Sequence, residues 1–204
     1  MAKKTTSRQP GPDRILDAAL DLAAENRWRD VTMEMIAGAS GATMARVYEL
    51  FPSKTALVTA FIHRTDQAVL AGHDFDDASE PCRERLLDVL MRRLDILHPR
   101  RAAVASITRD LGTDPGALLC SVPAFAGSMA WCLEAAGIRS SGVMGVMRIK
   151  GLSLIYLAAL RVWLKDDTQD FSRTMAQIDK NLKRAEALMS ALPFGREKPR
   201  AAER

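Results

Sequence analysis

Residues 32–54 most strongly predict two short helices joined by a tight turn. Thr32 and Thr43 each precede a short run of helix-forming residues, and a threonine oxygen there caps a helix by accepting a bond from a backbone N–H. Gly41 lies between the runs and tolerates the positive φ that such a turn needs. Ala37 is small enough to let the second helix approach the first. The run therefore predicts a helix-turn-helix.

Hydrophobic periodicity in the rest of the chain also indicates helices. Apolar residues make up 48% of the 204 residues and aromatic residues only 5%. Runs of β-branched residues are scarce while Ala, Leu and Met are abundant, which favours helix over sheet, and no stretch alternates cleanly between apolar and polar. We therefore expect an all-α fold of about nine helices, with a three-helix head at the N-terminal end and a longer helical body behind it.

Capping residues, glycines and prolines predict where the helices begin and end. Helices are expected from Asp13, after Thr32, after Thr43 to about Phe51, from Lys54 towards His73, and then over 80–97, 99–111, 114–137, 141–165 and 169–191. Ser121 and Pro123 are expected to split or kink the 114–137 helix. The predicted domains are a disordered basic arm (1–12), a helix-turn-helix domain (13–62), a ligand-binding and dimerisation domain (63–192) and a disordered tail (193–204).

The motifs of residues 13–62 together resemble the DNA-binding signature of the TetR family. They are Ile-Leu-Asp-Ala-Ala-x-x-Leu in the first helix, Trp28 and Val31-Thr32 in the connector, then Ile-Ala, Gly, a capping hydroxyl, Val-Tyr and Phe-x-Ser-Lys. The resemblance has no gap over this range, which makes it specific. It implies a cytoplasmic transcriptional regulator, a repressor, that binds a double-stranded DNA operator as a homodimer.

Carried over by position, the resemblance implies a set of DNA-contacting residues. They are Thr32, Thr43, Met44, Ala45, Arg46, Tyr48 and Lys54. The threonines stand at helix N-termini, where phosphates bind, and Tyr48 and Lys54 match the family residues that meet the DNA backbone. Arg46 is the residue at the start of the recognition helix that can bind guanine through two hydrogen bonds. Three interpretations without DNA contact stay open. The threonines would serve only as helix caps, the Tyr48 hydroxyl would only be solvated, and Met44 would point inward beside Val47 and Phe51.

Charge is unevenly placed along the chain. The net charge of +4 comes from the two ends, where Lys3, Lys4 and Arg8 could add contacts to DNA or serve only as a solubilising tail. Residues 13–62 hold five basic and seven acidic residues. Asp17, Asp21 and Glu25 are expected to form a solvated acidic stripe. Glu49 lies near Arg46 on the recognition helix, where a carboxylate is unfavourable close to phosphates unless it accepts from a cytosine amine.

The helical body contains long apolar stretches that are expected to be buried away from water. Residues 151–160 are apolar on every side, and dimerisation through the last two helices, as the family implies, would cover part of them. The uncharged run 115–133 is interrupted by prolines and glycines, so we expect an interior helix lining a core or cavity, not a stable membrane insertion. Candidates to line a pocket for a small hydrophobic effector are Phe125, Met129, Trp131, Met147, Ile155 and Tyr156, which are otherwise plain core and interface residues.

A second resemblance offers an alternative function. The progression of residues over 131–190 is similar to the C-terminal half of the lipid-binding accessory proteins of ubiquinone biosynthesis, which share the TetR-like fold. That resemblance implies an isoprenoid-binding protein without specific DNA recognition. It covers no short diagnostic motif.

Enzymatic chemistry is not indicated. His63, His73 and His98 are isolated, and the common nucleophile, zinc and phosphate-loop motifs do not occur. No cofactor, catalytic residue or metal ligand is therefore expected. The odd number of cysteines and a polar N-terminus without an apolar signal segment favour a reducing, cytoplasmic location.

Overall fold

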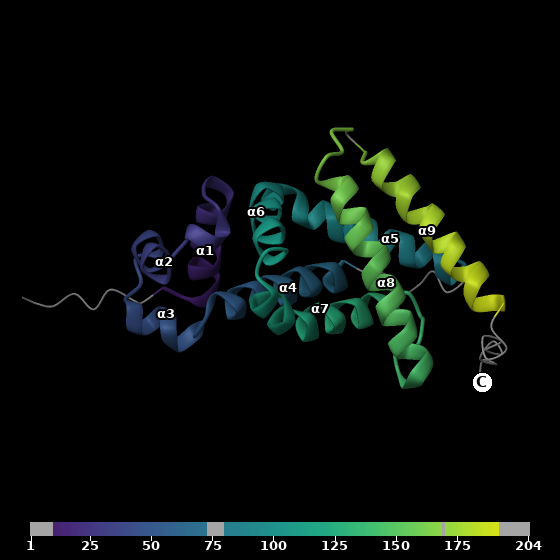
Figure 1. Cartoon of the computed structure of the whole chain (residues 1–204), viewed down its shortest axis with the longest axis horizontal. Helices are drawn as coiled ribbons and strands as arrows, with labels where there is room; N and C mark the ends of the chain where they lie inside the picture. The colour runs from purple at the N-terminus through teal and green to yellow at the C-terminus, as the bar shows by residue number, and fades with distance from the viewer. Residues whose placement is uncertain (1–9, 73–79, 169, 192–204) are drawn as a thin grey trace, which may run out of the picture. The chain divides into compact units, whose positions relative to one another are not determined.

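The computed structural model describes residues 10–72, 80–168 and 170–191, and these residues form helices without any strand (Figure 1). The predicted all-α class is confirmed. In chain order the described elements are α1 (Pro12–Glu25), the 3-10 turn η1 (Trp28–Asp30), α2 (Met33–Ser40), α3 (Met44–Leu50), α4 (Lys54–Ala71), α5 (Cys82–Leu97), η2 (His98–Arg100), α6 (Arg101–Leu111), α7 (Pro115–Ala135), α8 (Gly142–Trp163) and α9 (Ser172–Ala191).

The chain divides into two compact units. The first holds the described residues of 1–72 and 93–128, and the second those of 73–92 and 129–204. The predicted border between residues 62 and 63 falls inside α4, so the functional domain limits stay a prediction. Residues 1–9 and 192–204, and with them most of the expected arm and the whole expected tail, lie outside the described residues.

The local signals of the helix-turn-helix act as the sequence predicts. The side-chain oxygen of Thr32 accepts from the Met35 N–H, and that of Thr43 accepts from the Arg46 N–H, both at 3.2 Å. Gly41 ends α2 with a φ of 72°, a left-handed conformation that glycine adopts without steric cost. The caps and this glycine set the lengths of α2 and α3.

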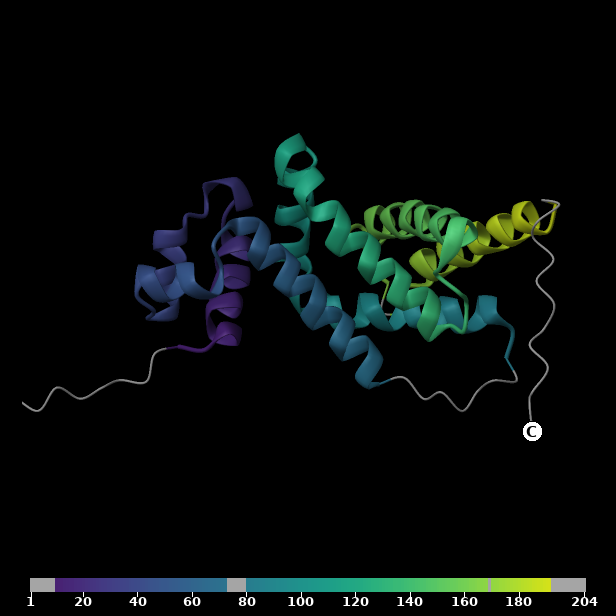
Figure 2. The same ribbon diagram turned by 90° about the horizontal axis from the view of Figure 1, so that it is seen from below.

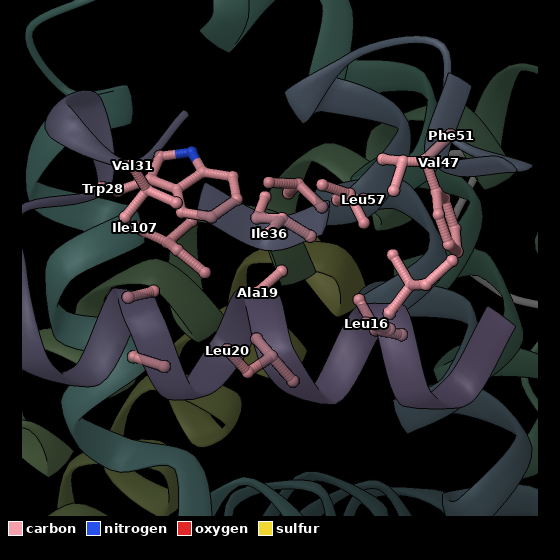
Figure 3. Packing of buried hydrophobic residues seen from close by; sticks show 14 of the residues in the cluster. Leu16, Ala19, Leu20, Trp28, Val31, Ile36, Val47, Phe51, Leu57 and Ile107 are labelled. Atoms are coloured by element: carbon pink, nitrogen blue, oxygen red, sulfur yellow. The ribbon is translucent and has the colours of Figure 1, made fainter. Parts of the chain in front are cut away.

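The core of the first unit is made by α1, α2, α3, α4 and α6 (Figure 3). Leu16 and Ala19 on α1 face Ile36 on α2 and Leu57 on α4 in this view. Ile107 of α6 belongs to the same buried cluster. A helix far along the chain thus completes the core beneath the helix-turn-helix.

Polar side chains of α6 also hold the η1 turn in place. Ser106 accepts from the Trp28 N–H at 2.8 Å and donates to the carbonyl of Asn26 at 2.8 Å. Asp110 accepts from the Arg29 N–H at 2.8 Å. Both side chains are buried. Since buried backbone groups are costly when unpaired, these bonds anchor the connector between α1 and α2 to α6.

In the second unit α8 and α9 lie side by side (Figures 1 and 2). Trp163 and Phe171 meet edge to face with ring centroids 6.3 Å apart. Between the two helices the buried carboxylate of Asp166 accepts from the Thr168 hydroxyl at 2.6 Å and from the hydroxyl and N–H of Thr174 at 2.7 and 2.9 Å. Burial acts to raise the pKa of Asp166, but these bonds outweigh it and lower the pKa to about 2.

The structure bears on two predictions about α7. The helix is continuous through Pro123, so the expected split is wrong, and the alternative of a kink at that proline stays a prediction. Met129 and Cys132 are buried, as expected of an interior helix, whereas Leu119 and Trp131 are exposed. By length and composition α7 and α8 are both apolar enough to span a membrane, a test that core helices of soluble proteins also pass.

Candidate nucleic-acid interface

The recognition helix α3 has one buried side and one exposed side. Val47 is fully buried in the core, and Phe51, just after the helix, is also buried. Tyr48 is 70% exposed and Met44 is 50% exposed. The inward position considered for Met44 is therefore wrong, because Val47 and Phe51 suffice to anchor the helix. Ala45 is exposed as well.

The two capping threonines are exposed at the N-termini of α2 and α3. In each, the oxygen accepts from its own helix. A threonine hydroxyl can donate at the same time as it accepts, so capping and a phosphate contact are compatible. The structure thus supports the cap and leaves the DNA contact of Thr32 and Thr43 a prediction.

Arg46 is paired with an acidic residue on its own helix. Its Nη1 lies 2.7 Å from Oε2 of Glu49, three residues further on. The Arg46 side chain is 28% exposed and that of Glu49 is 65% exposed. The Glu49 carboxylate, which is unfavourable close to DNA phosphates, is therefore paired with Arg46, the arginine that is expected to bind guanine.

Lys54 adopts an arrangement that the sequence does not predict. Its ammonium group donates to the carbonyl of Trp28 and lies 4.6 Å from the centroid of the Trp28 ring. Burial lowers the pKa of Lys54, against the opposing influence of Asp110 and Asp30. Because the tryptophan is distant in sequence, no local signal indicates that this lysine folds back. Its predicted phosphate contact requires the side chain to swing outward.

The acidic stripe of α1 is neutralised by arginines from later elements. Asp17 lies 3.0 Å from Arg64 on α4 and 3.1 Å from Arg100 on η2, and Arg100 also pairs with Asp21. The Asp17 side chain is 42% exposed and that of Asp21 is 64% exposed, so the two carboxylates meet water as expected but are also paired with arginines. Arg64 and Arg100 offset the excess of two acidic residues counted over 13–62, because both lie outside that range.

The predicted ligand residues fall in different surroundings. Phe125 belongs to the first unit and the other five to the second. Met129 and Tyr156 are buried, whereas Trp131 and Met147 are exposed. A pocket of about 540 Å³ in the first unit is lined by Trp28, Lys54, Asp110, Pro115 and neighbouring residues, and by none of the six. A shared pocket for these six residues stays a prediction.

Within the same described ranges, no three side chains among His, Cys, Asp and Glu converge in a way that would hold a metal ion. The site is thus a protein surface of mixed polar and apolar side chains on a short helix. Such a surface suits binding to another molecule through hydrogen bonds and apolar contacts.

Known proteins resemble the chain both in sequence and in fold. Residues 15–61 match the family model described as bacterial regulatory proteins, tetR family. An uncharacterised helix-turn-helix transcriptional regulator of Mycobacterium tuberculosis is 30% identical over 99 residues. That match covers 48% of this chain and 41% of the relative, so the chain spans less than half of that protein.

Solved structures extend the likeness to most of the chain. A TetR transcriptional regulator from Nitrosomonas europaea matches with a TM-score of 0.67 and 22% identity, over 85% of this chain and 96% of that one. One from Rhodococcus sp. RHA1 matches with a TM-score of 0.63 and 22% identity, over 84% and 93%. These likenesses show the fold, and the comparisons do not favour a lipid-binding accessory protein. Residues 15–61 therefore form an N-terminal domain of the TetR family of bacterial regulatory proteins, on a chain that folds as TetR regulators do.

Proposed function

We propose that this protein is a cytoplasmic, homodimeric transcriptional repressor that binds a double-stranded DNA operator through α3. The observation that carries the proposal is the exposed side of α3, where Tyr48, Met44 and the Arg46–Glu49 pair lie on a helix fixed by Thr43 and Val47. An α-helix presented in this way fits the major groove, where each base pair has a distinct pattern of donors and acceptors.

The α8 helix supports association of two copies. Its exposed apolar residues recur at helical spacing along one side, with the exposed Lys150 among them, and are Val143, Val146, Met147, Leu154 and Leu157. An apolar stripe of this length is rare on a monomer and marks an interaction site. In a symmetric dimer through α8 and α9 the stripe would cover itself, and the two heads would meet half-sites about one helical turn apart.

A small apolar effector is the second part of the proposal. α7 and α8 are both strongly apolar yet mostly unburied in the single chain, so a ligand as well as a second copy has apolar surface to cover. Phe125, Met129, Trp131, Met147, Ile155 and Tyr156 are the residues we propose for it. A ligand that binds better to the DNA-free arrangement of the heads would lower operator affinity by that difference.

The DNA-binding proposal is tested by selection followed by titration. The purified full chain is used to enrich a pool of random DNA duplexes, and the enriched sequence is titrated at two salt concentrations. Arg46→Ala is expected to weaken binding to that sequence by about tenfold or more, because it removes a guanine contact worth roughly 1–3 kcal/mol. Tyr48→Phe, which removes one backbone contact, is expected to weaken binding less.

Lys165→Ala serves as the charge-matched control, since Lys165 is exposed and lies in the second unit. It loses one positive charge, as Arg46→Ala does, and should bind the enriched sequence like the unaltered protein. Failure to enrich any sequence would overturn the proposal. Equal affinity of all variants for the enriched sequence would do the same.

A further inference from the structure

We propose that Glu49 is a positioning residue for base recognition, which holds the guanidinium of Arg46 in the orientation that reads one guanine of the operator. The inference rests on the proposed function and adds to it a source of specificity. The inference also explains why an acidic side chain lies on a helix that is expected to approach DNA phosphates.

The geometry of the pair leaves a reading edge on Arg46. A guanidinium carries five N–H donors, and Glu49 engages Nη1 at 2.7 Å. The Nε atom of Arg46 is buried and has no hydrogen-bond partner among the described residues. The Nε edge therefore faces the protein. Each terminal nitrogen carries two N–H bonds, so Nη1 keeps one donor besides the one given to Glu49, and together with Nη2 it can meet the O6 and N7 acceptors of guanine.

Both residues are also held by the fold. The backbone N–H of Arg46 is capped by Thr43, and Val47, between the two residues of the pair, is fully buried. The Arg46 side chain is less exposed than that of Glu49, so the arginine has less freedom to move than its partner. A long side chain that is already ordered loses less rotamer entropy on binding, and the saving appears as affinity for the correct base.

Two effects of Glu49 on binding can be separated. Repulsion between its carboxylate and DNA phosphates acts on every sequence alike and depends on salt. Orientation of Arg46 acts only where a guanine is read. In water an exposed pair of this kind contributes little, but contact with DNA excludes water and makes a misplaced or unpaired charge costly. The positioning effect should therefore appear as base preference.

The test compares the full chain with Glu49→Ala, Glu49→Gln, Arg46→Ala and the double variant Arg46→Ala/Glu49→Ala. Each protein is titrated against the duplex enriched by the unaltered protein and against duplexes with each base pair replaced in turn. Glu49→Ala should reduce the preference at the guanine read by Arg46 by about threefold or more, out of a preference of about tenfold or more. Glu49→Gln keeps an acceptor oxygen and should retain most of that preference while binding all sequences more tightly.

The double variant decides whether Glu49 acts through Arg46. It should show the same base preference as Arg46→Ala alone, because no arginine is left to position. If Glu49→Ala leaves every base preference unchanged and only raises affinity overall, Glu49 is a repulsive charge and the inference is overturned. A further loss of preference in the double variant overturns it as well. If instead the unaltered protein enriches no sequence, the proposed function itself fails.

Discussion

Two helices rich in apolar residues, α1 in the first unit and the more apolar α8 in the second, differ in what lies over their outward faces. On α1 the apolar side is buried, and the opposite side carries Asp17 and Asp21 paired with arginines. On α8 the residues Leu152 and Tyr156 are buried, but Leu154 is 70% exposed and Val143 is 81% exposed.

The comparison teaches that the two helices are covered differently. In the first unit α1 buries its apolar side in a cluster with α2, α3, α4 and α6 and meets water with charged side chains, so one chain is sufficient to cover it. In the second unit apolar side chains of α8 stay uncovered, which costs free energy in water. We therefore expect changes in α8 to affect association as well as folding, and changes in α1, α2 and α3 to affect folding and DNA contact only.

The largest effect should come from a charge on the exposed stripe of α8. In a symmetric dimer Leu154→Glu places two uncompensated carboxylates in the interface, at about 2 kcal/mol or more each, which amounts to a loss of about 4 kcal/mol of association. Light scattering should then report a monomeric mass at micromolar concentration, whereas the unaltered protein is expected to have the mass of a dimer. Met35→Glu, an exposed apolar residue of α2, is the control and should stay dimeric. A monomeric unaltered protein would break the comparison.

The next largest effect should follow from adding a methyl side chain at Gly145 in α8. A Cβ there would overlap the backbone carbonyl of Ser140, and only a backbone shift can relieve the overlap. We expect Gly145→Ala to lower the free energy of unfolding by about 3 kcal/mol, measured by urea denaturation. Gly151→Ala in the same helix meets nothing within 4 Å and should stabilise the helix by up to about 1 kcal/mol. Equal responses at the two glycines would contradict the close approach.

A smaller effect is expected at the junction of α8 and α9. Asp166→Ala leaves the buried Thr174 donors without an acceptor, and we expect a loss of about 2 kcal/mol in the free energy of unfolding.

The pH dependence of this loss follows from the depressed pKa of Asp166. The folded value is about 2 against an ordinary 3.8, so the carboxylate stabilises the fold above pH 4 and the gain disappears as the pH falls from about 4 to 2. The stability difference between unaltered protein and Asp166→Ala should shrink over that interval in denaturation curves. A difference that is constant with pH would exclude this linkage.

The smallest effect should come from the cap of α3 in the first unit. Thr43→Ala removes the acceptor for the Arg46 N–H and should cost about 1 kcal/mol of stability. Thr43→Ser keeps the capping oxygen and is the matched control. Thermal unfolding measures both variants, and their dimer mass should be unchanged, because the first unit takes no part in the association proposed for α8. Dissociation of the Thr43→Ala dimer would show that the two units are not independent in this respect.

The local features of the head were predictable because their causes are local in sequence. Thr32, Gly41, Thr43 and Ser53 act within three or four residues of where they stand, through side-chain caps and a left-handed turn. The same is true of Asp114, whose carboxylate accepts from the Ala117 N–H at 3.0 Å at the start of α7. Such signals can be recognised in the amino-acid sequence alone.

The features that escaped prediction depend on partners far along the chain. Asp17 meets Arg100, Lys54 folds onto Trp28, and α6 supplies Ile107 to the core beneath the helix-turn-helix. The apolar composition of α7 also predicted an interior helix. Composition cannot distinguish a helix that its own chain covers from one whose exposed apolar residues are left for another molecule to cover.

The amino-acid sequence by itself determined the helical class, the ends of most helices and the identity of the helix-turn-helix, because hydrogen bonds and backbone preferences within a few residues set them. Only the tertiary structure decided which charges are neutralised, where Lys54 lies, and which apolar faces are left for a partner. Those outcomes depend on distances between segments that are remote in the chain, and no local pattern encodes them.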